Sequence, residues 1–423
     1  MTYHGTMIKR FITAGAFAAL STTALTGMAQ AQDLRMTVWT GSEAHLDMLN
    51  GIAAAFAEDH PGVTVSFETV PFADYVQKIT LQLAGGNAPD MGWLLETSAP
   101  TFVQAGVLAE IGETLRGTEG YDFDDLSQPA MGLWQEGDDV YGVPFSTSPF
   151  IIYYNASMYD AAGLEHPDVL AANGEWTWEV LAEQAATLTD PANGVYGFQS
   201  VDGEGYGSRA MHTLIPIIRA YGGDAWSEDG TCGFASPEAV EAATLYHDMI
   251  YGTEAAVPPG EQGDFFTGNA ALTMTQISRV SKLDGVDFDW GIAPLPSGPA
   301  GDVGVVGQAA VVAFANAPHP ELAAEFIAFM TNAENTATMS AFFPPARASV
   351  LSSDDYLSSN PAVTPEQMQI VAGGIETGKV LPDHPAYPQI EAAMRPAFDA
   401  LWQPDADPQA AMDGLCAAIE PLL

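Results

Sequence analysis

The sequence predicts an α/β protein of two lobes. Strand and helix patterns alternate over residues 34–95, and a second alternation begins after residue 155. Strands that alternate with helices form mainly parallel sheets flanked by helices. Proline-rich breaks separate the alternating segments, and 423 residues are enough for two domains. We therefore expect two sheet-and-helix lobes between which the chain passes back and forth.

The stretch Tyr141–Asn155 is where we expect the chain to cross between lobes. Its apolar run at residues 150–153 is typical of a buried strand. Pro144 and Pro149 flank a patch of small polar residues, and each proline removes a backbone donor. This pattern predicts that the chain enters the sheet by an irregular, exposed step. The alternative is an ordinary central strand within one domain.

The first lobe is expected to open with a strand, helix, strand, helix, strand series. The strands are predicted at residues 34–39, 63–70 and 91–95, and the helices at residues 44–59 and 72–83. In open parallel sheets, ligands bind beyond the carboxyl ends of the strands. Those ends lead into the loops at residues 39–43, 68–71 and 96–98. None carries a phosphate-binding glycine motif, so we expect no nucleotide cofactor.

Helix starts in the rest of the chain carry capping signals. Thr177, Ser236 and Thr364 are predicted N-caps, and Gln367 stands where a capping box requires it. Proline-rich segments at residues 294–303 and 344–347 are two further breaks. Together with the step near Ser146–Pro149, they are candidate hinge segments.

The first 31 residues have the pattern of a cleaved export signal. Lys9 and Arg10 precede an apolar run, and Ala29-Gln30-Ala31 matches the small-x-small cleavage pattern. No cysteine lies near this point, so we do not expect a lipid anchor. We expect residues 1–31 to be removed and the remaining protein to be soluble and periplasmic.

The protein expected after cleavage is strongly acidic. Losing Lys9 and Arg10 leaves ten basic residues against 54 acidic ones, a net charge of −44. Such a surface repels nucleic acid and anionic lipid, so neither is an expected partner. It also remains soluble at high salt, which indicates a marine or halophilic setting.

Two cysteines remain, Cys232 and Cys416. An oxidising compartment permits a disulfide between them. The sequence leaves this pairing open against two buried free thiols.

Several stretches carry a resemblance to a known family, in that family's order. They are AFAEDHPGVTVSFETVPFADYVQKI, LAGGNAPDMGWL, YGVPFSTSPFIIYYNASMYDAAGL, EWTWEVLAEQAATLTDP, GNAALTM, FDWGIAPLPSGPAG, AEFIAFMT and PPARASV. Together they span most of residues 34–350. The chain resembles the extracellular solute-binding proteins, family 1, of ATP-binding-cassette importers, in the sugar-binding branch that includes maltose-binding protein.

This resemblance implies a two-lobe periplasmic-binding-protein fold, type II-like, with a ligand cleft that closes by a hinge. The N-terminal lobe would comprise residues 32–147 plus 303–345, and the C-terminal lobe residues 148–302 plus 346–423. The implied function is capture of a neutral carbohydrate and delivery to inner-membrane permease subunits. The protein would be a monomer with no enzymatic activity, cofactor or metal.

Sugar sites combine planar polar side chains with an aromatic face. The candidates are Trp39, Ser42, Glu43, Glu96 and Ser98 in the first lobe, and Ser148, Gln199, Trp226, Gln276 and Arg347 in the hinge and second lobe. Core packing is the alternative for Trp39 and Trp226. A helix-dipole role is the alternative for Glu43, and a structural ion pair is the alternative for Arg347.

Other ligands and activities stay open at this point. Few cations are expected along the candidate loops, which favours a neutral sugar or polyol over glycerol 3-phosphate or another non-sugar solute. A secreted carbohydrate-active hydrolase would need two carboxylates at a fixed separation, and acidic residues are too abundant here to identify such a pair. The histidines are scattered without metal-ligand spacing.

The charge gives a testable prediction about salt. Repulsion among 54 acidic side chains destabilises the compact state at low ionic strength, and salt screens it. We expect the melting temperature to rise between low and molar sodium chloride. A melting temperature that falls over this range, measured by differential scanning fluorimetry, would contradict the halophilic interpretation.

Overall fold

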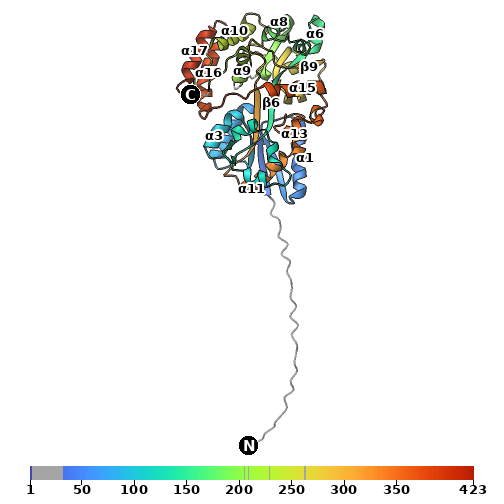
Figure 1. Ribbon diagram of the computed structural model, residues 1–423, viewed down its shortest axis with the longest axis vertical. Helices are drawn as coiled ribbons and strands as arrows, with labels where there is room; N and C mark the ends of the chain where they lie inside the picture. Colours follow the sequence, from blue (N-terminus) through green and yellow to red (C-terminus); the bar gives the residue numbers. More distant parts are fainter. Residues whose placement is uncertain (2–31, 204, 208, 228, 262) are drawn as a thin grey trace.

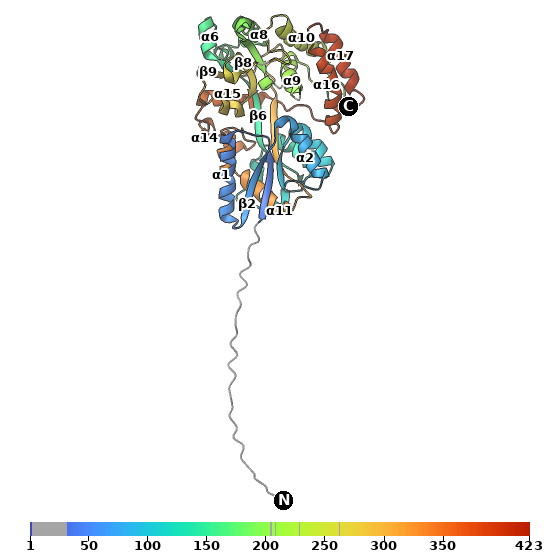
Figure 2. The same ribbon diagram turned by 180° about the vertical axis from the view of Figure 1, so that it is seen from behind.

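The computed structural model describes Met1 and residues 32–423, except residues 204, 208, 228 and 262. The predicted export signal therefore lies, apart from Met1, outside the described residues. Two lobes are stacked along the long axis, with β6 running from one into the other (Figures 1 and 2). No helix in the described part of the chain is long and apolar enough to cross a membrane.

The first lobe opens with the predicted series of strands and helices. It consists of β1 (Gln32–Val38), α1 (Glu43–Asp59), β2 (Val63–Thr69), α2 (Tyr75–Ala84) and β3 (Met91–Leu95). β1 lies between β2 and β3 and pairs with both in parallel. The three strands therefore end at one edge of the sheet, as expected from the sequence.

Shorter elements follow in this lobe. They are η1 (Phe72–Asp74) before α2, then η2 (Glu96–Ser98), α3 (Ala99–Gln104), α4 (Gly112–Gly117), η3 (Phe123–Asp125), α5 (Gln128–Met131), η4 (Gly132–Trp134), β4 (Gln135–Glu136) and β5 (Asp139–Val140).

The crossing strand is β6 (Val143–Asn155), and it differs from the predicted irregular, exposed step. The strand is continuous, and all of its residues except the half-buried Thr147 are buried. Ala309 pairs with Ser146 and Ala310 with Pro144, so Phe145 is an extra residue that absorbs the irregularity as a bulge. Pro149 is the last β6 residue paired with β10, so its missing donor coincides with the change of partner.

The second lobe surrounds the far half of β6. Its elements are α6 (Ala156–Ala162), α7 (Pro167–Ala172), α8 (Trp178–Leu188), η5 (Pro191–Asn193), β7 (Tyr196–Ser200), η6 (Val201–Gly203), α9 (Ala210–Tyr221), α10 (Pro237–Tyr251), η7 (Phe265–Thr267), β8 (Ala270–Gln276), η8 (Ile277–Leu283) and β9 (Trp290–Ala293).

The chain then returns to the first lobe and ends in helices. The remaining elements are β10 (Val306–Ala313), α11 (Pro320–Met330), α12 (Ala333–Met339), α13 (Ala348–Leu351), α14 (Asp354–Leu357), α15 (Pro365–Thr377), α16 (Tyr387–Leu401) and α17 (Pro408–Ile419). The predicted caps are confirmed: Thr177 and Ser236 accept backbone hydrogen bonds, and Thr364 and Gln367 form the capping box.

One sheet of eight strands runs through both lobes, in the order β2-β1-β3-β10-β6-β8-β7, with β9 also on β6. The outer pairs are parallel, whereas β10 and β6 pair antiparallel with each other and with their other neighbours. The antiparallel centre arises because β6 leaves the first lobe and β10 re-enters it.

Each lobe has its own packed core. Val143 and Phe145 of β6 belong to the core of the first lobe, whereas Phe150 and Ile152 belong to that of the second. A further cluster, around Tyr153 and Tyr356, packs elsewhere in the second lobe. The domain boundaries proposed from the sequence stay a prediction.

The open question about the cysteines is resolved in favour of a disulfide. Cys232 and Cys416 are bonded, with their Cα atoms 5.5 Å apart. The bond joins α17 to the loop before α10 and so fixes the last helix of the chain to the second lobe.

Candidate functional site

The aromatic centre of the site is Trp39, which follows β1. Its indole packs edge-on against Phe72, Tyr75 and Trp93, with ring centroids 5.0 to 5.8 Å apart. Trp39 is only half-buried, so it contributes to the core on one side and lines open space on the other. The core-packing alternative and the binding role are therefore both compatible with its position.

Three cavities between the lobes share Trp39 in their walls, and we call them together the cleft. The central cavity measures about 60 Å³, and the flanking ones about 230 Å³ and 740 Å³. The central cavity is lined by Trp39, Phe72, Leu95, Glu96, Phe145, Ser146, Ser148, Arg209, His212, Gln276, Ser278, Gly307, Gln308, Ala309 and Phe343. Both lobes contribute to every cavity.

The lobes touch across the cleft. The Arg209 guanidinium of the second lobe stacks on the ring of Phe72 at 5.4 Å and also on Phe150. At the other side, Ser42 Oγ donates to Ser281 Oγ at 3.5 Å. Contacts of this kind exist only while the cleft is narrow.

Glu96 is the most unusual polar residue of the cleft. Its side chain is fully buried, and Oε2 accepts a hydrogen bond of 3.0 Å from the backbone nitrogen of Gln308. Oε1 has no hydrogen-bond partner, and His212 Nε2 lies 3.9 Å from it. Ser148 Oγ and His212 Nδ1, in the same cavity, are also unpaired. Buried polar atoms are normally paired, so three unpaired ones together indicate a place for a ligand's polar groups.

Gln276 supplies a planar amide to the central cavity. Nε2 donates to the carbonyl oxygen of Ser148 at 3.2 Å, and Oε1 accepts from Arg209 Nη2 at 3.3 Å. Gly307 lies against this amide, and a Cβ atom there would stand 2.4 Å from Nε2. Glycine at this position therefore leaves room for the amide against β10.

More cations line the cleft than the sequence led us to expect. They are Arg209, Arg279, Lys282 and Arg395, and the acidic residues in the same walls are Glu43, Asp47, Glu96, Asp284 and Glu391. Arg279 and Lys282 also pair with Asp202, and Arg395 with Glu391. Because acidic residues match or outnumber basic ones, the walls carry no excess positive charge for a phosphate ester.

The structure brings together seven of the ten candidate residues. Those that line the cleft are Trp39, Ser42, Glu43, Glu96, Ser98, Ser148 and Gln276. Gln199, Trp226 and Arg347 line none of the three cavities.

Gln199 and Trp226 have structural partners instead. Gln199 donates to the carbonyl oxygen of Gly263 and accepts from the backbone nitrogen of Phe265, so it fixes a loop of the second lobe. Trp226 is buried in the core of that lobe, where its ring faces Tyr387 at 6.4 Å. For Trp226 the packing alternative describes the structure.

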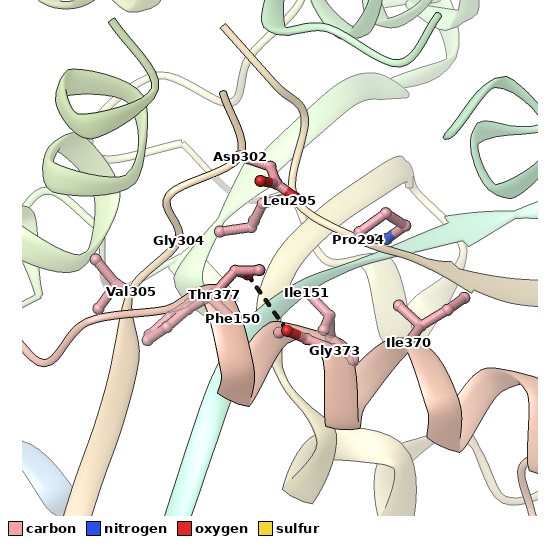
Figure 3. Close-up of a pocket in the computed structure, with 11 residues that line it drawn as sticks. Phe150, Ile151, Pro294, Leu295, Asp302, Gly304, Val305, Ile370, Gly373 and Thr377 are labelled. Carbon is pink, nitrogen blue, oxygen red and sulfur yellow. Dashed lines mark hydrogen bonds between the residues drawn. The ribbon is translucent and has the colours of Figure 1, made fainter. Parts of the chain in front are cut away.

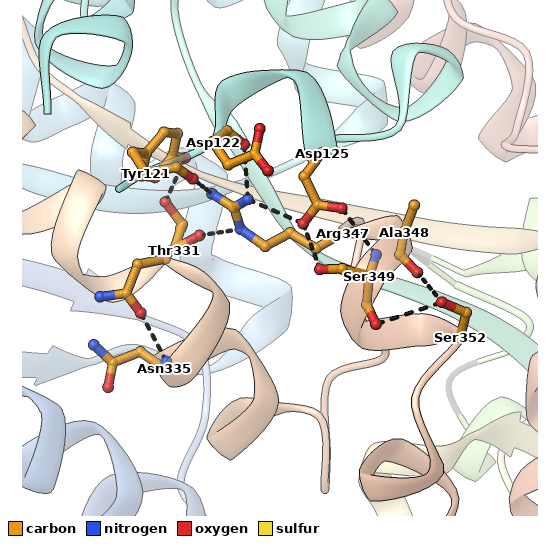
Figure 4. Close-up of polar contacts among 10 residues, drawn as sticks. Tyr121, Asp122, Asp125, Thr331, Asn335, Arg347, Ala348, Ser349 and Ser352 are labelled. Atoms are coloured by element: carbon orange, nitrogen blue, oxygen red, sulfur yellow. Dashed lines mark hydrogen bonds and ion pairs between the residues drawn. The ribbon is translucent and has the colours of Figure 1, made fainter. Parts of the chain in front are cut away.

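Arg347 is a structural residue that binds the backbone of the first lobe, not a cleft residue (Figure 4). Its guanidinium donates to the carbonyl oxygens of Thr331, Tyr121 and Asp122 at 2.7 to 3.0 Å. It also pairs with Asp125 at 3.2 Å and is 1% exposed. The sequence showed that basic residues are few in this chain. It did not show that Arg347 is already hydrogen-bonded to these buried partners.

The residues that sequence reasoning missed come from both lobes. They include Phe72, Arg209, His212, Phe343 and Tyr387. Phe72 directly follows the loop predicted at residues 68–71 and could have been included. Which side chains of α9 and α16 reach the cleft depends on how the two lobes dock. A local sequence pattern contains no information about that docking.

A further cavity lies beside β6 and under α15 (Figure 3). It measures about 200 Å³, and its walls are mainly apolar. Asp302 is the one charged residue among those that line it. It lacks the set of polar groups that the cleft offers.

Two buried histidines of the cleft generate a prediction about pH. Burial and the nearby Arg279 lower the pKa of His45 to about 4. Burial lowers the pKa of His212 as well, against the opposing attraction of Glu96. In the unfolded chain both would titrate near their ordinary pKa of about 6.5. The unfolded state therefore takes up protons first, and stability is lost as the pH falls from about 6.5 towards 4.

For His45 we expect this loss to approach about 1.4 kcal/mol per pH unit at its steepest, and His212 adds a loss in the same direction. Unfolding free energies measured from pH 8 to pH 4 should depend less on pH in the His45→Gln/His212→Gln variant than in the wild type. Carboxylate titration is common to both proteins. Identical slopes would show that these histidines are not buried as neutral groups.

Comparison with known proteins agrees with this architecture. Residues 45–337 match the family described as bacterial extracellular solute-binding proteins. A Brucella abortus protein provisionally named as a binding protein is 28% identical, over 77% of this chain and 78% of its own length. An arabinooligosaccharide-binding protein of Halalkalibacterium halodurans is 24% identical, over 69% and 66%.

A solved structure shares the fold. The Listeria monocytogenes substrate-binding protein in complex with cycloalternan superimposes with a TM-score of 0.82 at 22% identity, over 93% of this chain and 99% of that one. The match to the family covers more than half of the chain. The chain belongs to the bacterial extracellular solute-binding proteins.

Proposed function

We propose that this protein captures a neutral carbohydrate in the cleft and delivers it to the membrane permease of an ATP-binding-cassette importer. One observation carries the proposal: Glu96 Oε1, Ser148 Oγ and His212 Nδ1 are buried and unpaired in one cavity bordered by Trp39. Hydroxyl groups both donate and accept, so a sugar can satisfy all three atoms.

The walls suit the remaining surface of a sugar ring. Trp39, Phe72, Phe145 and Phe343 provide aromatic surface for the ring's C–H groups. The acidic and basic residues of the walls balance, which favours a neutral ligand over glycerol 3-phosphate. A ligand lacking a matching hydroxyl would leave a buried polar atom unpaired, at a cost of about 1–3 kcal/mol.

Two of the compared proteins support this ligand class. One is named for arabinooligosaccharide, and the other was solved with cycloalternan. Relatives at these identities do not specify the sugar, so the chemistry of the cleft carries the assignment.

Closure would couple binding to transport. β6 crosses between the lobes, β10 begins beside the crossing point at Pro149, and the cleft lies beside both strands. A ligand held by Glu96 of one lobe and by Ser148, Gln276 and His212 near the other makes all its contacts only when the cleft is narrow. Binding therefore shifts the population towards the closed form that a permease would recognise.

The same proposal includes several properties of the whole protein. Residues 1–31 direct export and are cleaved, and the mature protein is a periplasmic monomer. It binds its ligand without catalysing a reaction, and it has no nucleic-acid partner. The N-terminal lobe comprises residues 32–147 plus 303–345, and the remainder of the mature chain forms the other lobe.

The experiment is a thermal-shift screen with neutral sugars, polyols, sugar acids and glycerol 3-phosphate, followed by calorimetric titration. A ligand of the folded state raises the melting temperature as its concentration increases. We expect a neutral sugar to do so and Glu96→Gln to weaken its binding about tenfold to a hundredfold, as loss of a charged hydrogen bond predicts.

The matched control is Glu113→Gln, an exposed glutamate at the start of α4 that lines no part of the cleft. It should bind like the wild type. Stabilisation by glycerol 3-phosphate alone, or equal effects of the two variants, would contradict the assignment. Breakdown of the sugar during incubation would contradict the absence of catalysis.

A further inference from the structure

We propose that the natural ligand is an oligosaccharide of at least two rings, and that the 740 Å³ cavity is an extension subsite with a wall positioned by Asp202. This inference rests on the proposed function and specifies the size of the ligand. It is carried by volumes, by a second set of unpaired polar atoms and by a strained turn.

The volumes exclude a ligand confined to the centre. Small-molecule sites usually measure about 300–1,000 Å³. The central cavity, with its three unpaired atoms, holds about 60 Å³, whereas the neighbouring cavity across Trp39 holds about 740 Å³. A sugar bound to Glu96 must therefore extend into a neighbouring cavity, and one ring would leave most of the larger one unfilled.

The larger cavity has unpaired polar atoms of its own. His45 Nε2 and Trp93 Nε1 have no hydrogen-bond partner, although His45 is 5% exposed and Trp93 is fully buried. Both residues line this cavity and neither lines the central one. Two sets of unpaired atoms, in two cavities that share Trp39 in their walls, match two consecutive rings.

The remaining wall suits hydroxyl groups. Thr40, Ser42, Ser278 and Ser281 supply hydroxyls from both lobes, and Phe343 adds aromatic surface. Few of these groups would be useful to an apolar ligand. An additional sugar ring uses donors, acceptors and an aromatic face together.

Asp202 positions two donors on this wall. It is 8% exposed, and its carboxylate pairs with Arg279 Nε and, at 3.5 Å, with Lys282 Nζ. The side chains of Arg279 and Lys282 are 32% and 47% exposed and line the cavity, whereas the buried Asp202 does not line it. The pairing lowers their net charge while leaving donor hydrogens for sugar oxygens.

The backbone at this point is strained. Val201 and Asp202 have φ values of 47° and 55°, and a β-branched residue rarely adopts the left-handed region. Such strain persists where the surrounding structure enforces it, and it gathers at ligand sites. Here the turn that follows β7 places the Asp202 carboxylate within ion-pair distance of Arg279 and Lys282.

The test is calorimetric titration of the mature protein with glucose, maltose and maltotriose, and with arabinose, arabinobiose and arabinotriose. We expect, in the series that binds, about a tenfold or greater gain in affinity from monosaccharide to disaccharide, equivalent to about one or two added hydrogen bonds. A monosaccharide that binds as tightly as its oligomers would overturn this inference and leave the proposed function standing. Absence of binding to all six sugars, together with a thermal-shift screen in which no neutral sugar stabilises the protein, would overturn both.

Variants test the role of Asp202. In Asp202→Asn the ratio of the monosaccharide dissociation constant to the disaccharide dissociation constant should move towards one. The reason is that Arg279 and Lys282 lose the carboxylate that positions them. Asp399→Asn, at an exposed position of α16, is the matched control and should keep the wild-type ratio. If Asp202→Asn does not fold, Lys282→Met removes one donor while leaving the turn, and should reduce the ratio in the same direction. An unchanged ratio in the folded variant tested would overturn the role of this wall.

Discussion

The pairing of β6 with β10 is the constraint on which the rest of the structure depends. The two strands run antiparallel through the middle of the sheet: β6 continues from the first lobe into the second, and β10 begins beside the crossing point at Pro149. Because their pairing lies at the centre of the sheet, it holds the two lobes together at one junction, and any hinge motion must take place around that junction. The bulge at Phe145 and the change of partner after Pro149 allow β6 to pair first with β10 and then with β8.

The same strands determine the chemistry of the cleft. The backbone of Gln308 on β10 holds one oxygen of Glu96, and the Gln308 side chain accepts from Trp134 Nε1 at 2.8 Å. Ser148 on β6 and Gln276 on β8 meet opposite this carboxylate. Two of the three unpaired polar atoms, Glu96 Oε1 and Ser148 Oγ, are thus held by the rigid centre of the molecule, which preorganises them.

Much of the fold could be predicted because its signals are local. The alternation over residues 34–95, the caps at Thr177 and Thr364 and the loops after β1 and β3 depend on neighbours in sequence. The contributions of Arg209 and His212 depend on how α9 docks against the other lobe, which no local pattern encodes. Arg347 was wrongly predicted to bind ligand. It attracted attention because basic residues are few in this chain, but its buried partners Tyr121 and Thr331 are distant in sequence and could not be foreseen.

The most direct test of this account is a crystal structure of the mature protein with the sugar that stabilises it most. The account predicts a ring against Trp39, a sugar hydroxyl within hydrogen-bond distance of Glu96 Oε1, and contacts to both lobes at once. A sugar bound in the cavity under α15, or on one lobe alone with Glu96 still unpaired, would contradict it.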